Sequence, residues 1–231
     1  MKKLLFIVSI FSLIACKNET HDFTLKGSIK GLKKGKVYLQ KQQDSILITI
    51  DSIDISGQPS FELHSKLTEP EVLFLKLDKN DNDDGIIPFF ADKGLTEIHT
   101  TLKNFNFDAK VTGSKQQVLL DEYLVMMSKF NDKNLDLIKE NFESKKENDT
   151  LSFDFESEYN SLLKRKYLYT INFAVNNNDS EVSPYLALTE IPRTSVKYLE
   201  TIYDALEAPI KTSLYGKELK AVIEKRKQEE K

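Results

Sequence analysis

The chain has 231 residues, of which 40% are hydrophobic, and its 33 basic and 36 acidic side chains leave a formal net charge of −3. This composition is typical of a globular protein, and the length suffices for one or two domains with cores of their own. No segment stands out as a basic face, which argues against nucleic acid as a partner because backbone binding requires clustered Lys and Arg side chains.

Residues 1–15 have the organisation of a secretory signal. Lys2 and Lys3 precede a mainly apolar, uncharged run from position 4 to 14, and the small residue Ala15 follows. The run is shorter than the roughly 20 apolar residues that a membrane-spanning helix needs. We therefore expect residues 1–15 to be a cleaved signal peptide rather than a membrane span.

Cys16 is the only cysteine in the sequence, and it ends the segment Leu-Ile-Ala-Cys at 13–16. This segment resembles the lipobox of bacterial lipoproteins. The resemblance implies cleavage between Ala15 and Cys16 and a diacylglyceryl group on the Cys16 thiol. The alternative is a coincidental cysteine near an ordinary signal cleavage site. Two or more acyl chains hold a protein stably at a membrane, since each buried methylene contributes about 0.8 kcal/mol.

A lipid on Cys16 would determine both the location and the available chemistry. Residues 16–22 would form a lipidated tether in the cell envelope. Lys17 and Asn18 give no retention signal of the Asp-after-Cys type, which favours the outer membrane, facing the periplasm. No thiol would remain for a disulfide, a metal site or a nucleophile, and we expect no cofactor.

Residues 23–113 are predicted to form an antiparallel β domain of the sandwich or barrel type. Short runs of alternating apolar and polar residues are separated by turn residues such as Gly31, Gly57 and Gly94. This pattern predicts about eight strands, at 23–27, 36–40, 46–55, 61–64, 71–77, 86–91, 95–101 and 105–111. The polar segment 78–85 is expected to be a solvated turn rather than a calcium loop.

Residues 114–231 are predicted to be helical, which makes the whole chain an α+β protein. Ser114 and Gln117 have the spacing of a capping box, and apolar residues then recur at helical intervals. The first helix is either continuous to Phe142 or broken at Asn131 and Asp132. Further helices are expected at 153–175, 183–188, 195–206 and 214–226.

Several short segments carry a resemblance that covers nearly all of the chain after residue 22. They are 23–27 (Phe-Thr-Leu-Lys-Gly), 35–39 (Gly-Lys-Val-Tyr-Leu), 51–52, 61–63, Pro70, 89–94, 111–114, 183–187 (Ser-Pro-Tyr-Leu-Ala) and 213–217 (Ser-Leu-Tyr-Gly-Lys). They are similar to the β domain of unknown function and the helical spacer that precede thioredoxin-like or peroxiredoxin-like domains in Bacteroidetes-type lipoproteins. This sequence has no Cys-x-x-Cys pair and stops at Lys231, where that domain would begin. No redox residue can therefore be assigned by resemblance.

Few residues are candidates for a site. Asp51 and Ser52 are weak binding candidates, and the favoured interpretation is that both side chains form local hydrogen bonds to the backbone at a bulge or strand bend. His21, His64 and His99 have no partner at metal-ligand spacing. No catalytic residue is predicted.

Three functions remain open at this point. The favoured one is a non-catalytic binding or interaction module at the membrane, with a protein partner or ligand in the envelope. The second is an accessory subunit of a thiol–disulfide or peroxiredoxin-type redox system that docks a separate thioredoxin-like protein. The third, with least support, is a hydrolase that uses paired carboxylates in a cleft.

Overall fold

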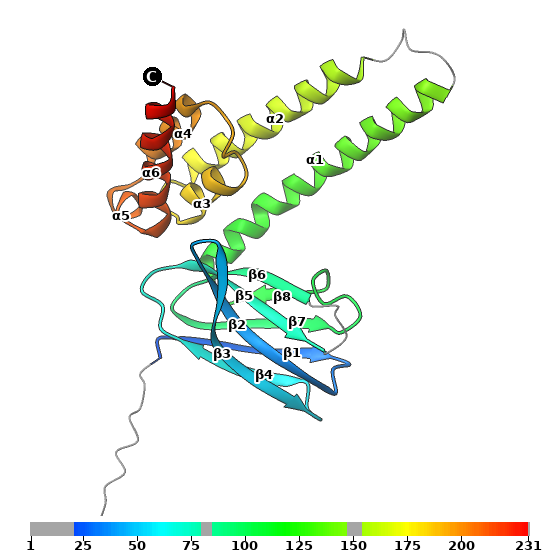
Figure 1. The fold of residues 1–231 in the computed structure, drawn as a ribbon, viewed down its shortest axis with the longest axis vertical. Coiled ribbons are helices and arrows are strands. Elements are labelled where there is room, and N and C mark those ends of the chain that lie inside the picture. Colours follow the sequence, from blue (N-terminus) through cyan, green and yellow to red (C-terminus); the bar gives the residue numbers. More distant parts are fainter. Residues whose placement is uncertain (1–20, 80–84, 147–153, 231) are drawn as a thin grey trace, which may run out of the picture.

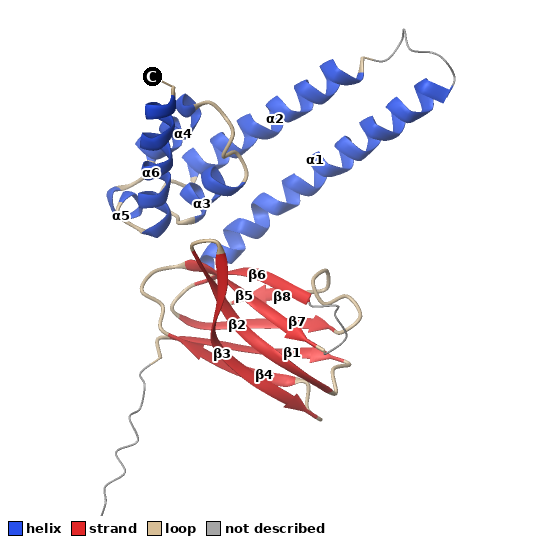
Figure 2. Cartoon of the chain, in the orientation of Figure 1, coloured by secondary structure: helices blue, strands red, loops and turns tan. Residues whose placement is uncertain are grey.

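The structure, a computed structural model, describes residues 21–79, 85–146 and 154–230. It is an α+β protein in which eight strands are followed by six helices within these ranges (Figure 1, Figure 2). The strands are β1 (Phe23–Lys30), β2 (Lys34–Gln43), β3 (Ile46–Ser56), β4 (Ser60–Ser65), β5 (Glu71–Asp78), β6 (Gly85–Ala91), β7 (Gly94–Thr101) and β8 (Lys110–Thr112). The helices are α1 (Lys115–Lys146), α2 (Phe155–Asn176), α3 (Val182–Thr189), α4 (Val196–Ala205), α5 (Ala208–Lys211) and α6 (Leu214–Glu229).

The strands form two four-stranded sheets, with the orders β4-β1-β7-β8 and β3-β2-β5-β6. Buried residues alternate with half-buried or exposed ones along β1, which is the pattern of a strand with one face on a core. The shared core contains fully buried side chains from both sheets, including Phe23, Leu25, Leu75 and Phe89. All strand pairs described are antiparallel except β1 with β7, which run parallel.

The expected strand at 105–111 is wrong over most of its length, because β8 covers only Lys110–Thr112. The preceding residues form turns that side chains hold together. The Thr101 hydroxyl donates to the Asp108 carboxylate at 2.7 Å, and Thr100 donates to the Phe105 carbonyl at 2.7 Å. Phe105 is buried against the core from within this turn, so an apolar residue there marks packing rather than a strand.

The helices follow the predicted order, with two differences. α1 is continuous through Asn131 and Asp132, so the alternative with a break is wrong. Both residues are exposed, and their weak helix propensity costs only some tenths of a kcal/mol each. The short helix α5 was not predicted. The segment 80–84 and the predicted helix start at 153 lie outside the described residues.

The start of α1 is fixed to β6 by side chains. The Gln117 amide donates to the Ser114 hydroxyl at 3.0 Å, as the capping pattern predicts. In a complete capping box the Gln117 side chain would bond back to the Ser114 amide. Here it accepts the Phe90 amide hydrogen at 2.7 Å, and Asp92 accepts from the Lys115 amide at 2.6 Å. The end of β6 therefore supplies part of the cap, and α1 begins at a set position on the sheet.

A second apolar cluster joins the sheet to the helices. It contains Val72 and Phe90 from the outer face of the β3-β2-β5-β6 sheet, together with Tyr123 and Met127 of α1 and Leu186 of α3. The buried Tyr123 hydroxyl lies 2.8 Å from the Thr170 hydroxyl of α2, which gives the polar atom of this cluster a partner. Across the described ranges, no helix is long and apolar enough to cross a membrane.

Gly27 offers a test of the sandwich. A Cβ atom at this position would overlap the Ile98 carbonyl oxygen and the Phe61 ring, which lies on the neighbouring strand. We predict that Gly27→Ala lowers the free energy of unfolding by about 1–3 kcal/mol, the usual cost of overpacking. Urea unfolding followed by far-ultraviolet circular dichroism would measure it. The control is Lys26→Ala, an exposed position in the same strand, and equal stability of the two variants would contradict the packing described.

Candidate functional site

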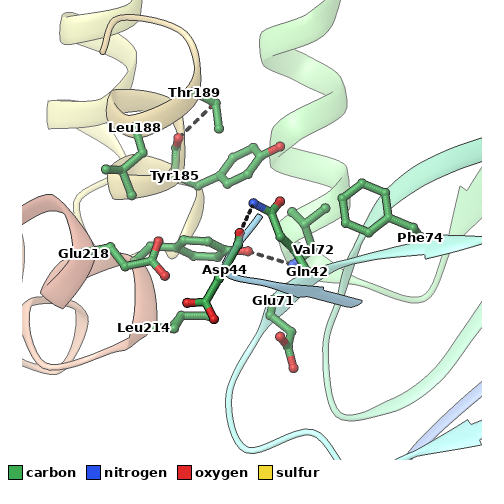
Figure 3. A pocket seen from close by; sticks show the side chains of 11 residues that line it. Gln42, Asp44, Glu71, Val72, Phe74, Tyr185, Leu188, Thr189, Leu214 and Glu218 are labelled. Carbon is green, nitrogen blue, oxygen red and sulfur yellow. Dashed lines mark hydrogen bonds between the residues drawn. The ribbon is translucent and has the colours of Figure 1, made fainter. Parts of the chain in front are cut away.

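A cleft with a volume of about 410 Å³ lies between the β domain and the helical region (Figure 3). That volume is in the range of small-ligand sites. Its β side comes from the turn between β2 and β3 and from β5, and its helical side comes from α3 and α6. The lining residues are Gln42, Asp44, Glu71, Val72, Phe74, Tyr185, Leu188, Thr189, Leu214, Tyr215 and Glu218.

Tyr215 holds the two sides of the cleft together. Its hydroxyl oxygen accepts the Val72 amide hydrogen at 2.8 Å, which joins α6 to β5. Its ring makes edge contacts with Phe90 and Tyr185, at centroid distances of 5.8 and 5.3 Å. Burial raises the pKa of the Tyr215 hydroxyl, so the group stays protonated and its own hydrogen remains to be donated.

Three carboxylates line the cleft, and their charges are only partly balanced. Asp44 comes from the β side and Glu218 from the helical side (Figure 3). Burial raises the pKa of Glu71 and of Glu218. Lys41 opposes this shift at Glu71, with its nitrogen 3.9 Å from the carboxylate. The lining side chains thus include three acidic groups and no basic group, and Lys41 lies next to one of the acids.

Two further carboxylates, which do not line the cleft, bind the residues at the start of α6. Glu69 accepts the Leu214 amide hydrogen at 2.7 Å. The Ser213 hydroxyl donates to the Glu181 carboxylate at 2.7 Å, and Ser213 also caps α6. Glu181 is only 5% exposed, and burial raises its pKa. Acidic side chains near the amino end of a helix are favourable, because the helix dipole is positive there.

The weak candidates Asp51 and Ser52 lie on β3 and are not among the residues that line the cleft. Asp51 accepts the Ser52 amide hydrogen and the His64 amide hydrogen, both at 2.7 Å. It thereby joins β3 to β4 next to the register shift at Leu39 and Gln40. The bond to Ser52 is local, as in the favoured interpretation of the pair, whereas the bond to His64 connects two strands. Ala15 and Cys16 lie outside the described residues.

The histidines are spread over the β domain. The rings of His21 and His64 stack at 5.1 Å, and the Ser28 hydroxyl lies 2.8 Å from a ring nitrogen of His99. Among the residues that the structure describes, no group of three or more His, Cys, Asp or Glu side chains could hold a metal ion.

The sequence did not single out the residues of the cleft. Tyr185 and Tyr215 each stand third in a segment that carried the family resemblance, 183–187 and 213–217. Both segments begin with a serine at or near a helix start. The sequence signal that could have pointed to these residues is a tyrosine at the same place in two otherwise dissimilar helix starts. Nothing in that signal indicated that the two tyrosines share a cleft.

Comparison with known proteins accounts for the β domain. The family model DUF4369, a domain of unknown function, matches residues 23–120. This range is a DUF4369 domain. The domain includes all eight strands and the first turns of α1, which agrees with the bonds from Gln117 to β6. The predicted β domain of unknown function is confirmed. No curated protein and no solved structure matches the chain.

The range matched by the family model includes only one side of the cleft. Its β side, with Asp44, Glu71 and Phe74, belongs to the DUF4369 domain, whereas Tyr185, Tyr215 and Glu218 lie beyond the matched range.

Glu181 predicts a pH dependence of stability. Its pKa in the folded protein lies above the usual 4.5, so the stability it contributes is complete below about pH 4.5 and is lost as the pH rises through the folded pKa. In Glu181→Gln the neutral amide can still accept the Ser213 hydrogen bond. We predict that this variant becomes more stable relative to the wild type at about pH 7.5 than at about pH 4.5. Urea unfolding at both pH values measures the difference, and a pH-independent difference would contradict it.

Proposed function

We propose that the protein is a lipid-anchored, non-catalytic binding module of the cell envelope, and that its ligand occupies the cleft between the DUF4369 domain and the helical region. The single observation that carries the binding role is the cleft itself, whose walls combine aromatic rings with incompletely neutralised carboxylates. We further propose that the ligand presents a protonated amine or guanidinium group on an apolar body.

The membrane anchor follows from residues 13–16. Leu-Ile-Ala-Cys ends a short apolar run, and the thiol of Cys16 is the only one in the chain. The supported location is the outer membrane, with the folded domains in the periplasm.

The ligand class follows from the lining of the cleft. Carboxylates that burial deprives of water gain from a cation that restores a charge partner. Asp44 and Glu218 have no ion pair among the described residues, so they offer free acceptors. The rings of Tyr185 and Tyr215 and the side chain of Leu188 give an apolar surface, and a cation over an aromatic face adds about 0.5–2 kcal/mol.

One observation favours the hydrolase as a second candidate. Glu71 and Glu218 line the same cleft, and burial raises the pKa of each carboxyl. A carboxyl group with a raised pKa can act as a general acid near neutral pH. A non-catalytic site would leave a bound ligand intact, so recovery of chemically unchanged ligand after long incubation separates the two functions.

The anchor has its own test. We predict that the wild-type chain fractionates with membranes and incorporates radiolabelled palmitate in a bacterial host that has the lipoprotein pathway. Cys16→Ser should lose the label and the membrane association, because the thiol that receives the lipid is gone. Cys16→Ser that remains membrane-bound, or a wild-type chain without label, would contradict the anchor and would leave the ligand site untouched.

The ligand class is tested with a matched pair of probes, 1,5-diaminopentane as the cation and glutarate as the anion of the same length. By isothermal titration calorimetry we predict binding of the diamine and none of glutarate. Glu218→Gln should weaken binding by about tenfold, since a charge-assisted hydrogen bond contributes about 1.5–3 kcal/mol. Glu224→Gln is the control, because Glu224 lies on the same helix and pairs with Lys220.

The pH dependence of the same titration gives a further prediction. Since burial raises the pKa of Glu71 and Glu218, both carboxylates take up protons at a higher pH than usual. Binding of the diamine should therefore weaken between about pH 7.5 and about pH 5. Equal binding of both probes, or an equal effect of the two variants, would contradict the cationic ligand.

A further inference from the structure

The hairpin of α1 and α2 projects from the rest of the molecule (Figure 1). All buried residues of α1 lie in its first half, namely Gln117, Tyr123 and Met127, and none follows in the remaining stretch to Lys146. The second half of α1 contacts α2 on one side only, and its other faces have no partner in the described part of the chain. We refer to residues 128–146 of α1 and 155–166 of α2 as the arm.

Large apolar side chains are exposed on one face of the arm. Leu135, Ile138 and Phe142 are 63%, 45% and 64% exposed. Their spacing of three and then four residues places them in one stripe along the helix. This is the a/d spacing of helices that pack in bundles and coiled coils. An exposed apolar stripe on a projecting helix is a feature of association surfaces rather than of free surfaces.

The stripe continues into a groove between the two helices. The groove has a volume of about 130 Å³ and is lined by Phe130, Asn131, Asn134, Tyr159, Leu162, Leu163 and Lys166. Asn131 precedes Leu135 by four residues and so lies on the same face of α1. The Asn134 side-chain oxygen is buried there without a hydrogen-bond partner among the described residues.

The charges beside the stripe indicate what covers it. Asp132, Lys139 and Lys146 follow one another at intervals of seven residues, so they line one edge of the stripe. The acid is nearer the β domain, and the two bases are nearer the tip. A second arm in the antiparallel direction would place each Asp132 opposite a lysine of the other copy, whereas a parallel arm would place like charges together.

We propose that two copies of this chain associate through the arm, with the two hairpins antiparallel. Leu135, Ile138 and Phe142 of each copy then cover one another near a two-fold axis, and the paired hairpins form a four-helix arrangement. Such an interface is isologous, as in most two-fold dimers. It lies away from the cleft between α3, α6 and β5, so it holds or fails independently of the ligand proposed there.

The first experiment uses the near absence of thiols. Because Cys16 is the only cysteine, Ile138→Cys adds one reporter thiol close to the proposed axis. We expect mild oxidation of cells that express the full chain to give a disulfide-linked dimer of Ile138→Cys. Lys133→Cys, on another face of α1, and the unaltered parent should give none. Addition of Phe142→Asp should abolish the dimer without a change in circular dichroism, since the Phe142 side chain is 64% exposed.

The second experiment separates a specific interface from a merely adhesive surface. Sedimentation equilibrium of the purified full chain in detergent would give the dimer dissociation constant. Asp132→Lys should raise this constant by roughly threefold to tenfold, because exposed ion pairs contribute about 0.2–1 kcal/mol each and the symmetric interface has two. Asp132→Lys combined with Lys146→Asp should restore it, because an axis near Ile138 places position 132 of one copy opposite position 146 of the other.

Each contrary result would overturn the proposal. Equal crosslinking at positions 138 and 133 would mean random collision. A crosslink from position 138 to a different protein, with no homodimer, would mean that another partner covers the arm. A monomer in sedimentation, or a dimer that Phe142→Asp leaves intact, would exclude the arm as the interface.

Discussion

The architecture depends on the outer face of the β5–β6 strand pair being covered by the helices. Successive residues of these strands serve two cores, since Leu73 and Phe89 face the sandwich while Val72 and Phe90 face the helical cluster. Both faces of this strand pair are apolar. If one face were left in water, its apolar surface would be exposed, which is unfavourable. The helical region is therefore part of the fold of the β domain rather than an attachment to it.

Two backbone amides of the sheet bind side chains of the helices and so hold the helical region against the sheet. The amides of Val72 and Phe90, which face each other across the two strands, donate to the side chains of Tyr215 and Gln117. The helices α1 and α6 thus satisfy donors of the sheet, and an unsatisfied buried amide would be costly. The cleft exists because α6 is held at this distance from β5, and its lining combines residues that are far apart in the sequence.

Much of the fold could be predicted from local patterns. The alternation around Phe23 and Leu63 and the apolar run 71–77 indicate strands, and the recurrence of Tyr123, Met127 and Phe130 indicates a helix. The parallel pairing of β1 with β7 was not predictable, because partners some 70 residues apart are chosen by the whole sandwich and not by either strand. The turn at Phe105 looked like a strand because an apolar residue reports burial, not backbone conformation.

The cleft could not be predicted for a related reason. Val72 and Tyr215 are separated by 143 positions, and neither lies in a motif with a known chemical role. Glu71 and Glu218 resemble surface acids until the helices remove water from them. Only Asp51 and Ser52 looked unusual in the sequence, and their bonds hold β3 to β4. Local regularity thus predicts the elements, whereas the cleft arises from how they pack.

Native-state hydrogen exchange followed by NMR tests most directly whether the helices and the sheet fold as one unit. If they do, the Val72 and Phe90 amides exchange only through global unfolding, at the same free energy as the core amides of β1. Tyr215→Phe would then lower that shared free energy for both amides together. Rapid exchange at Val72 and Phe90 while the β1 amides stay protected would show that the helices open independently, and this would contradict a cleft formed in advance of its ligand.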